Sequence, residues 1–145
     1  MKLLSRPPSH SLIAAMAFVA ITAATSITLP QTAFAYDEQS TSALNVDSQG
    51  IALQGYDPVS YFTSSGPQQG VSEFVETVDG ATYWFASEEN LNAFKKNPEK
   101  YEPAFGGFCA MGVVFEKKLD VNPLLWRVVD GKLYLNVHKE AQARW

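Results

Sequence analysis

Two stretches of the sequence, residues 73–86 and 125–136, each contain two runs of apolar, β-branched or aromatic residues joined by Asp-Gly. Asp-Gly favours a type I′ turn, because both central residues of that turn need positive φ. Each stretch is therefore predicted to fold as a β-hairpin, with its turn at Asp79-Gly80 or at Asp130-Gly131. The two hairpins could meet in one small antiparallel sheet.

A helix is predicted between the hairpins. Ser87 is a typical N-cap, Glu88 and Glu89 suit the first turn, and Lys95 and Lys96 suit the last turn before Asn97-Pro98. Residues 138–144 are good helix formers and predict a second, terminal helix. The expected fold is α+β: a small antiparallel sheet built from two β-hairpins, with one main helix packed on it and a short C-terminal helix.

The first 35 residues have the pattern of a secretory signal peptide. Lys2 and Arg6 precede an uncharged stretch, residues 11–29, and Ala33-Phe34-Ala35 is a typical cleavage site. An uncleaved anchor is the alternative, because the stretch approaches the roughly 20 apolar residues that cross a bilayer. Its threonines weaken that alternative. The predicted organisation is residues 1–35 signal peptide, 36–50 flexible lead-in and 51–145 folded domain, which is periplasmic or secreted after cleavage near Ala35.

The charge of the exported part limits its partners. All 15 acidic residues and all but two of the 11 basic residues follow the signal peptide, so this part is acidic overall. Negative charge disfavours nucleic acid and anionic membranes as partners. We expect a metal ion, a small ligand or a protein as partner, no nucleic acid, and a membrane only if the signal stays uncleaved.

Three blocks of sequence resemble the exported branch of the YHS-domain family. They are GYDPVSYF at 55–62, YWFASEENLNAFKKNPEKYEPAFGGFCAMGV at 83–113 and NPLLWRVVDGKLYLN at 122–136. The resemblance implies a relation to short YHS and TRASH-type domains, which are treated as metal-binding modules. Their three cysteines fall on Ser60, Ala86 and Asn90 here, and none of these residues can replace a thiolate ligand. The inherited metal site is therefore expected to be absent.

Cys109 is the only cysteine of the chain and cannot form an internal disulfide. Three interpretations remain open for it: a small buried hydrophobic residue, a ligand of a soft metal ion, or a reactive thiol. For the second, we expect Cys109, Met111 and His138 to be the ligands and copper or zinc to be the ion. Cys109 and Met111 share a face only if their segment is extended. His138 could instead be an exposed imidazole at a helix start.

Two functional classes follow from these observations. The first, which we favour, is an exported binding domain for copper-type metal binding or metal homeostasis, with Tyr56, Asp57, Tyr61 and Phe108 as expected ligand-binding residues. The second is a non-catalytic structural or protein-interaction domain with a degenerate YHS metal site. An exposed cluster among Tyr56, Tyr61, Trp126 and Trp145 would favour the second class. No residue is assigned a catalytic role, and we expect no enzymatic activity.

Overall fold

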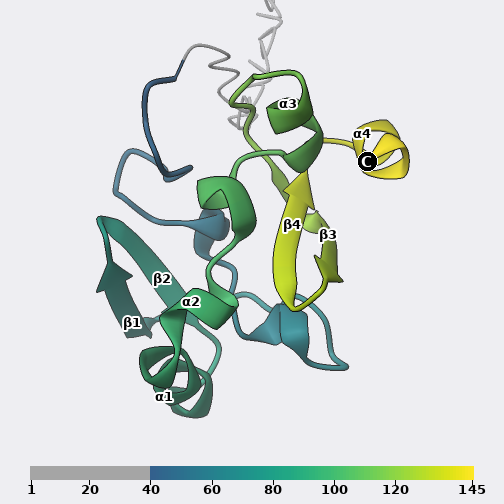
Figure 1. Ribbon diagram of the computed structural model, residues 1–145. Coiled ribbons are helices and arrows are strands. Elements are labelled where there is room, and N and C mark those ends of the chain that lie inside the picture. The colour runs from purple at the N-terminus through teal and green to yellow at the C-terminus, as the bar shows by residue number, and fades with distance from the viewer. Residues whose placement is uncertain (1–39) are drawn as a thin grey trace, which may run out of the picture. The chain divides into compact units, whose positions relative to one another are not determined.

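The structure, a computed structural model, describes residues 40–145. It contains two antiparallel hairpins, each of which is a separate two-stranded sheet (Figure 1). The strands are β1 Val71–Val78, β2 Ala81–Phe85, β3 Asn122–Val129 and β4 Lys132–Asn136. The helices are α1 Glu88–Lys96, α2 Pro98–Tyr101, α3 Ala110–Val114 and α4 Lys139–Arg144, with short 3-10 turns at Leu53–Gly55, Ser60–Phe62 and Ala104–Gly107. The predicted α+β class, both hairpins, the main helix and the terminal helix are confirmed.

The two hairpins form two sheets rather than the single sheet that the sequence suggested. Both Asp-Gly turns have the expected positive φ, 50° and 90° at Asp79 and Gly80, and 50° and 74° at Asp130 and Gly131. Loop backbone occupies the second edge of β2 and of β4, through isolated bridges that join Ile51 with Thr82, Pro103 with Leu133 and Cys109 with Leu135. Because those edges are occupied, neither β2 nor β4 can pair with a strand of the other hairpin.

Helix α1 begins and ends as its sequence predicts. The Ser87 side chain accepts a hydrogen bond from the Asn90 backbone N–H at 3.2 Å, as an N-cap does. The helix ends at Lys96, before Asn97 and Pro98. On its inner face Phe94 has no exposed surface, and its ring lies 5.0 Å from that of Tyr83. Burial of this helix therefore depends mainly on one aromatic side chain.

The β3–β4 hairpin and α4 repeat the construction of the β1–β2 hairpin and α1. Every strand pair of the first hairpin recurs in the second, displaced by 51 residues; examples are Val71 with Phe85 and Asn122 with Asn136. The same displacement relates the helix caps Ser87 and His138. It also relates the ring pair Tyr83 and Phe94 to the pair Tyr134 and Trp145.

The repetition extends to the loops before the hairpins, where the displacement becomes 52 residues. Leu53, Gln54 and Gly55 have φ values of 55°, 53° and 78°, and Phe105, Gly106 and Gly107 have 58°, 64° and 86°. After these tripeptides, the Asp57 N–H donates to the Gln68 carbonyl at 2.9 Å, and the Cys109 N–H donates to the Leu119 carbonyl at 3.0 Å. We call residues 53–96 the first repeat and residues 105–145 the second repeat; Asp57 and Cys109 are equivalent positions.

The part of the lead-in that the structure describes contacts the domain. The Asn45 N–H donates to the Gly106 carbonyl at 2.8 Å, and the Asn45 side chain donates to Asp120 at 3.0 Å. Leu44 and Val46 pack against the core. The signal peptide and the cleavage site lie outside the described residues. Within residues 40–145, no helix has the length and apolar character needed to cross a membrane.

Candidate functional site

Asp57 is fully buried and lies at the junction of three elements of the first repeat. Its Oδ1 accepts hydrogen bonds from the backbone N–H groups of Val59 at 2.8 Å and Ser60 at 3.3 Å. Its Oδ2 accepts from the Ala86 N–H at 2.9 Å and from the Asn90 side chain at 2.6 Å. We call this carboxylate and its four donors the Asp57 centre. It ties the turn after Asp57 to the end of β2 and to α1.

The Asp57 centre contains each position at which the resemblance places a family cysteine: Ser60, Ala86 and Asn90. Segments that are far apart in the sequence therefore meet at one place, as a shared ligand site would require. The residues present do not fit a metal ion there. Each carboxylate oxygen already accepts two hydrogen bonds, and the donors direct positive N–H ends toward the position that a cation would need.

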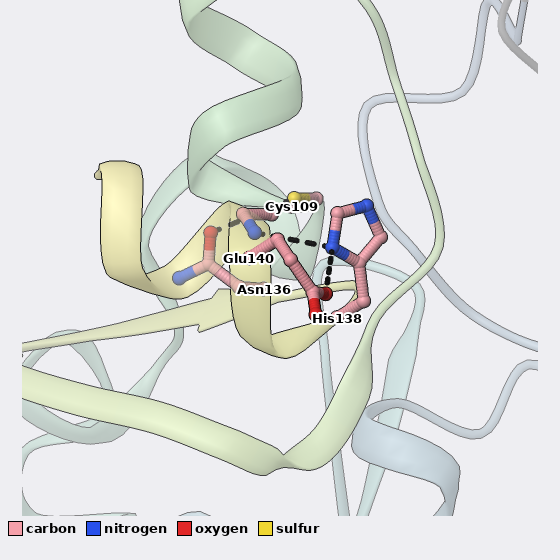
Figure 2. Close-up of polar contacts among 5 residues, drawn as sticks. Cys109, Asn136, His138 and Glu140 are labelled. Carbon is pink, nitrogen blue, oxygen red and sulfur yellow. Dashed lines mark hydrogen bonds and ion pairs between the residues drawn. The ribbon is translucent and has the colours of Figure 1, made fainter.

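Cys109 is also fully buried, and it is the N-cap of α3. Its sulfur accepts from the Gly112 N–H at 3.4 Å and donates to the Asn136 Oδ1 at 3.7 Å. Asn136 Oδ1 also accepts from the Met111 N–H at 3.3 Å. Figure 2 shows the Asn136 amide oxygen directed toward Cys109, at the end of β4. The thiol is therefore held by α3 and β4 in the position that Asp57 has in the first repeat.

The three predicted metal ligands, Cys109, Met111 and His138, do not form one coordination site in the structure. Met111 is the second residue of α3, so the segment after Cys109 is helical and the two side chains do not face each other. The His138 Nδ1 accepts from the Ala141 N–H at 3.1 Å and lies 3.2 Å from Glu140, with 56% of the side chain exposed (Figure 2). Within residues 40–145, no group of three His, Cys, Asp or Glu side chains could hold a metal ion.

The four expected ligand-binding residues have different environments. Tyr61 is buried, donates its O–H to the Pro123 carbonyl at 3.1 Å and packs edge-on against Trp126 at 5.6 Å. Phe108 is buried beneath the Lys118 ammonium, and Tyr56 is half-buried. A groove runs along α1 and α2, and none of these four residues lines it. Tyr61 and Asp57 thus belong to the core, where they hold loops in place.

Burial changes the titration of three acidic groups. Desolvation is the main cause that raises the pKa of the Tyr61 phenol far above its usual range, and the negative charge of Asp57 adds to it. The pKa of Tyr83 is raised in the same way, with Glu102 and Asp79 as further causes. Partial burial also raises the pKa of Glu102. The phenols of Tyr61 and Tyr83 therefore stay neutral and serve as packing groups.

Sequence reasoning missed the acceptor role that Asp57 and Cys109 share. Both residues follow a tripeptide with positive φ, and both accept from the N–H three residues later, that of Ser60 or that of Gly112. The available signal was the match of Gly55-Tyr56-Asp57 to Gly107-Phe108-Cys109. A cysteine sulfur is a weak hydrogen-bond acceptor, so Cys109 alone does not indicate an N-cap. Its capping role is indicated only when its segment is aligned with that of Asp57.

A prediction follows for the thiol. Because the Cys109 sulfur is fully buried and makes its contacts inside the protein, we expect the native protein not to react with a thiol reagent such as dithiobis(nitrobenzoate). Reaction should begin only as the chain unfolds in guanidinium. Cys109→Ser, which replaces the capping sulfur with a hydroxyl oxygen, should have a free energy of unfolding within about 1 kcal/mol of the wild type. Rapid labelling of the folded protein would contradict a structural role.

Comparison with known proteins identifies a family for part of the chain. The YHS domain model matches residues 71–104. No curated protein and no solved structure matches the chain. The matched residues run from β1 through α2 and include Ala86 and Asn90 of the Asp57 centre. The exported branch and the relation to TRASH-type domains remain predictions. By this match, the segment of the chain from β1 through α2 is similar to the YHS domain family.

Proposed function

We propose that this protein is a non-catalytic binding domain of YHS type that contacts another protein and has lost the metal site of its relatives. The observation that carries the proposal is the Asp57 centre. The three positions at which the resemblance places the family's cysteines provide backbone and amide N–H donors to one buried carboxylate. A site filled by these hydrogen bonds holds the fold together and leaves no lone pair for a metal ion.

Copper-type metal binding or metal homeostasis at Cys109 is the second candidate function. One observation favours it. The Cys109 sulfur and the Met111 backbone N–H both donate to the Asn136 amide oxygen, so two residues whose side chains carry soft sulfur ligands lie beside the same atom. Helical geometry at α3 and the exposed, capping position of His138 count against it. A soft metal ion would need both side chains and the histidine to turn toward one point.

The proposal excludes catalysis and includes export. Cys109 is buried and pairs with an amide rather than with a base, and the His138 Nδ1 is occupied by the Ala141 N–H and Glu140. A nucleophilic mechanism would need these two side chains to be hydrogen-bonded to each other. Export rests on the leader, residues 1–35, and would bring the domain to the periplasm or the exterior.

Metal titration tests the proposal. Cu(I) and Zn²⁺ should be titrated, against a competing chelator, into reduced wild-type protein and into Cys109→Ser. We expect no stoichiometric binding that depends on Cys109, because its sulfur is buried and no complete ligand set surrounds it within the described part of the chain. Tight binding of one ion per chain that disappears in Cys109→Ser would overturn the proposal and select the metal-binding alternative.

A further inference from the structure

Residues 42–46 of the lead-in are bound to the second repeat. The Asn45 N–H donates to the Gly106 carbonyl at 2.8 Å. The Asn45 side chain donates to the Gly107 carbonyl at 3.1 Å and to the Asp120 carboxylate at 3.0 Å. We call residues 42–46 the latch. It joins the positive-φ loop of the second repeat to a segment that precedes β3.

The first repeat makes the equivalent contacts with its own residues. The Gln54 carbonyl accepts from the Gln69 side chain at 3.4 Å, and the Gly55 carbonyl accepts from the Gly70 N–H at 2.8 Å. The latch, by contrast, lies outside both repeats and is held by a small number of contacts at a part-buried site. A segment held in this way opens locally at a lower free energy than the core strands do.

The docked latch explains the glycine at position 106. Gly106 has a φ of 64°, and Gln54, its equivalent in the first repeat, has a φ of 53° although it carries a side chain. The positive φ alone therefore does not require a glycine here. A Cβ added at Gly106 would overlap the Ala43 carbonyl oxygen. The absence of a side chain at this position is thus matched to the close approach of the latch.

The latch also holds the segment that covers Cys109. Asp120 accepts from the latch, and the Lys118 ammonium donates to the carbonyl of Ser42, the first latch residue. Leu119 lies between these two residues, and its carbonyl accepts from the Cys109 N–H at 3.0 Å. The two residues that flank Leu119 are therefore fixed by the latch, and Leu119 itself is fixed against the segment of the buried thiol.

We propose that the latch controls access to the Cys109 thiol. While the latch is docked, residues 118–120 stay in place and the thiol is fully buried. When the latch is released, residues 118–120 separate from Cys109, and the thiol becomes accessible to small reagents while both hairpins remain folded. This inference goes beyond the proposed function and is independent of it, because it involves neither a metal ion nor a partner protein.

Gly106→Ala tests the latch, and Gly131→Ala is its matched control. Each variant adds a Cβ at a positive φ, 64° or 74°, but only the Cβ at Gly106 meets the latch, and no atom lies within 4 Å of a Cβ at Gly131. The folded full chain is treated with dithiobis(nitrobenzoate). The Cys109 thiolate attacks the disulfide of the reagent, forms a mixed disulfide and releases one thionitrobenzoate anion, whose absorbance gives the rate. Hydrogen exchange of the Asn45 amide reports latch release.

We expect Gly106→Ala to expose the Asn45 amide to exchange and to label Cys109 at least tenfold faster than Gly131→Ala does, with the amides of β3 and β4 still protected. The wild type, whose latch is docked, should stay unreactive. A thiol that stays protected while the Asn45 amide exchanges freely would overturn the proposal. So would an Asn45 amide equally protected in both variants, or labelling that accelerates only together with exchange in β3 and β4.

A second pair of variants covers the case in which Gly106→Ala does not fold. Asn45→Ala removes the two side-chain hydrogen bonds of the latch without adding a clash. Asn92→Ala, at an exposed asparagine of α1, is its control. Asn45→Ala should label faster than Asn92→Ala, again with β3 and β4 protected. Equal labelling rates in these two variants would overturn the proposal.

Discussion

Asp57→Ala is expected to lower the free energy of unfolding by at least about 3 kcal/mol, because it leaves the buried Val59 N–H and the part-buried Ala86 N–H and Asn90 amide without an acceptor, and each unsatisfied donor costs roughly 1–3 kcal/mol. The Ser60 N–H keeps its hydrogen bond to the Asp57 backbone carbonyl. The substitution also separates the turn after Asp57 from β2 and α1. Urea denaturation followed by circular dichroism would measure the change. Should the variant fail to fold, Asp57→Asn gives a milder test of the same centre.

Asp57→Asn separates the contributions of the two carboxylate oxygens. Its remaining oxygen can accept from Val59 and Ser60, while its NH₂ group would face the donors of Ala86 and Asn90. We expect a loss between those of wild type and Asp57→Ala. Asp47→Ala is the control, since Asp47 accepts from the N–H groups of Gln49 and Ile51 at an exposed site. Equal losses at Asp47 and Asp57 would contradict a special role for the buried carboxylate.

Phe94→Ala is expected to cost about 3–5 kcal/mol of stability, because it deletes a fully buried ring that touches Tyr83, Phe85 and Tyr101. The repeat supplies its control. Trp145→Ala removes the equivalent ring, which is half-buried and has a ring contact with Tyr134 alone among the described residues, so its loss should be about 1 kcal/mol. Both are measured in the same denaturation series.

The difference between these two variants tests whether the ring of Phe94 contributes more to stability than the equivalent ring of Trp145. A similar, large loss of stability for both variants would mean that Trp145 is as important for the fold as Phe94. A small loss at Trp145 with a large one at Phe94 is the result that the exposed fractions imply.

Local signals in the sequence were sufficient for the hairpins and for α1. The Asp-Gly turns require positive φ, and the Ser87 cap with acidic first-turn and basic last-turn residues defines the helix almost residue by residue. These features depend on neighbours in the chain. The separation of the hairpins into two sheets could not be predicted, because it depends on which loop segments occupy the edges of β2 and β4.

The candidate site is formed by contacts between residues that are distant in the sequence. The sequence pointed to Asp57 and Cys109 individually, but it did not show which residues they contact. Asp57 was expected to bind a ligand, yet its Oδ2 accepts a hydrogen bond from Asn90, which is 33 residues away in the sequence. Cys109 stood out as a lone thiol, but its equivalence to Asp57 appears only when the registers of both hairpins are compared. The loop before the second hairpin is one residue shorter than the loop before the first. The two repeats therefore cannot be aligned at a single spacing, and this conceals the repetition in the sequence.

We propose that Ser60, Ala86 and Asn90 share one location where hydrogen bonds to Asp57 take the place of metal ligands. The most direct measurement is Zn²⁺ titration of wild type beside the triple variant Ser60→Cys, Ala86→Cys and Asn90→Cys. Three thiols at one place, with the Asp57 carboxylate beside them, should bind one ion per chain, and the wild type should bind none at this centre. A folded triple variant that binds no more Zn²⁺ than the wild type would contradict the claim.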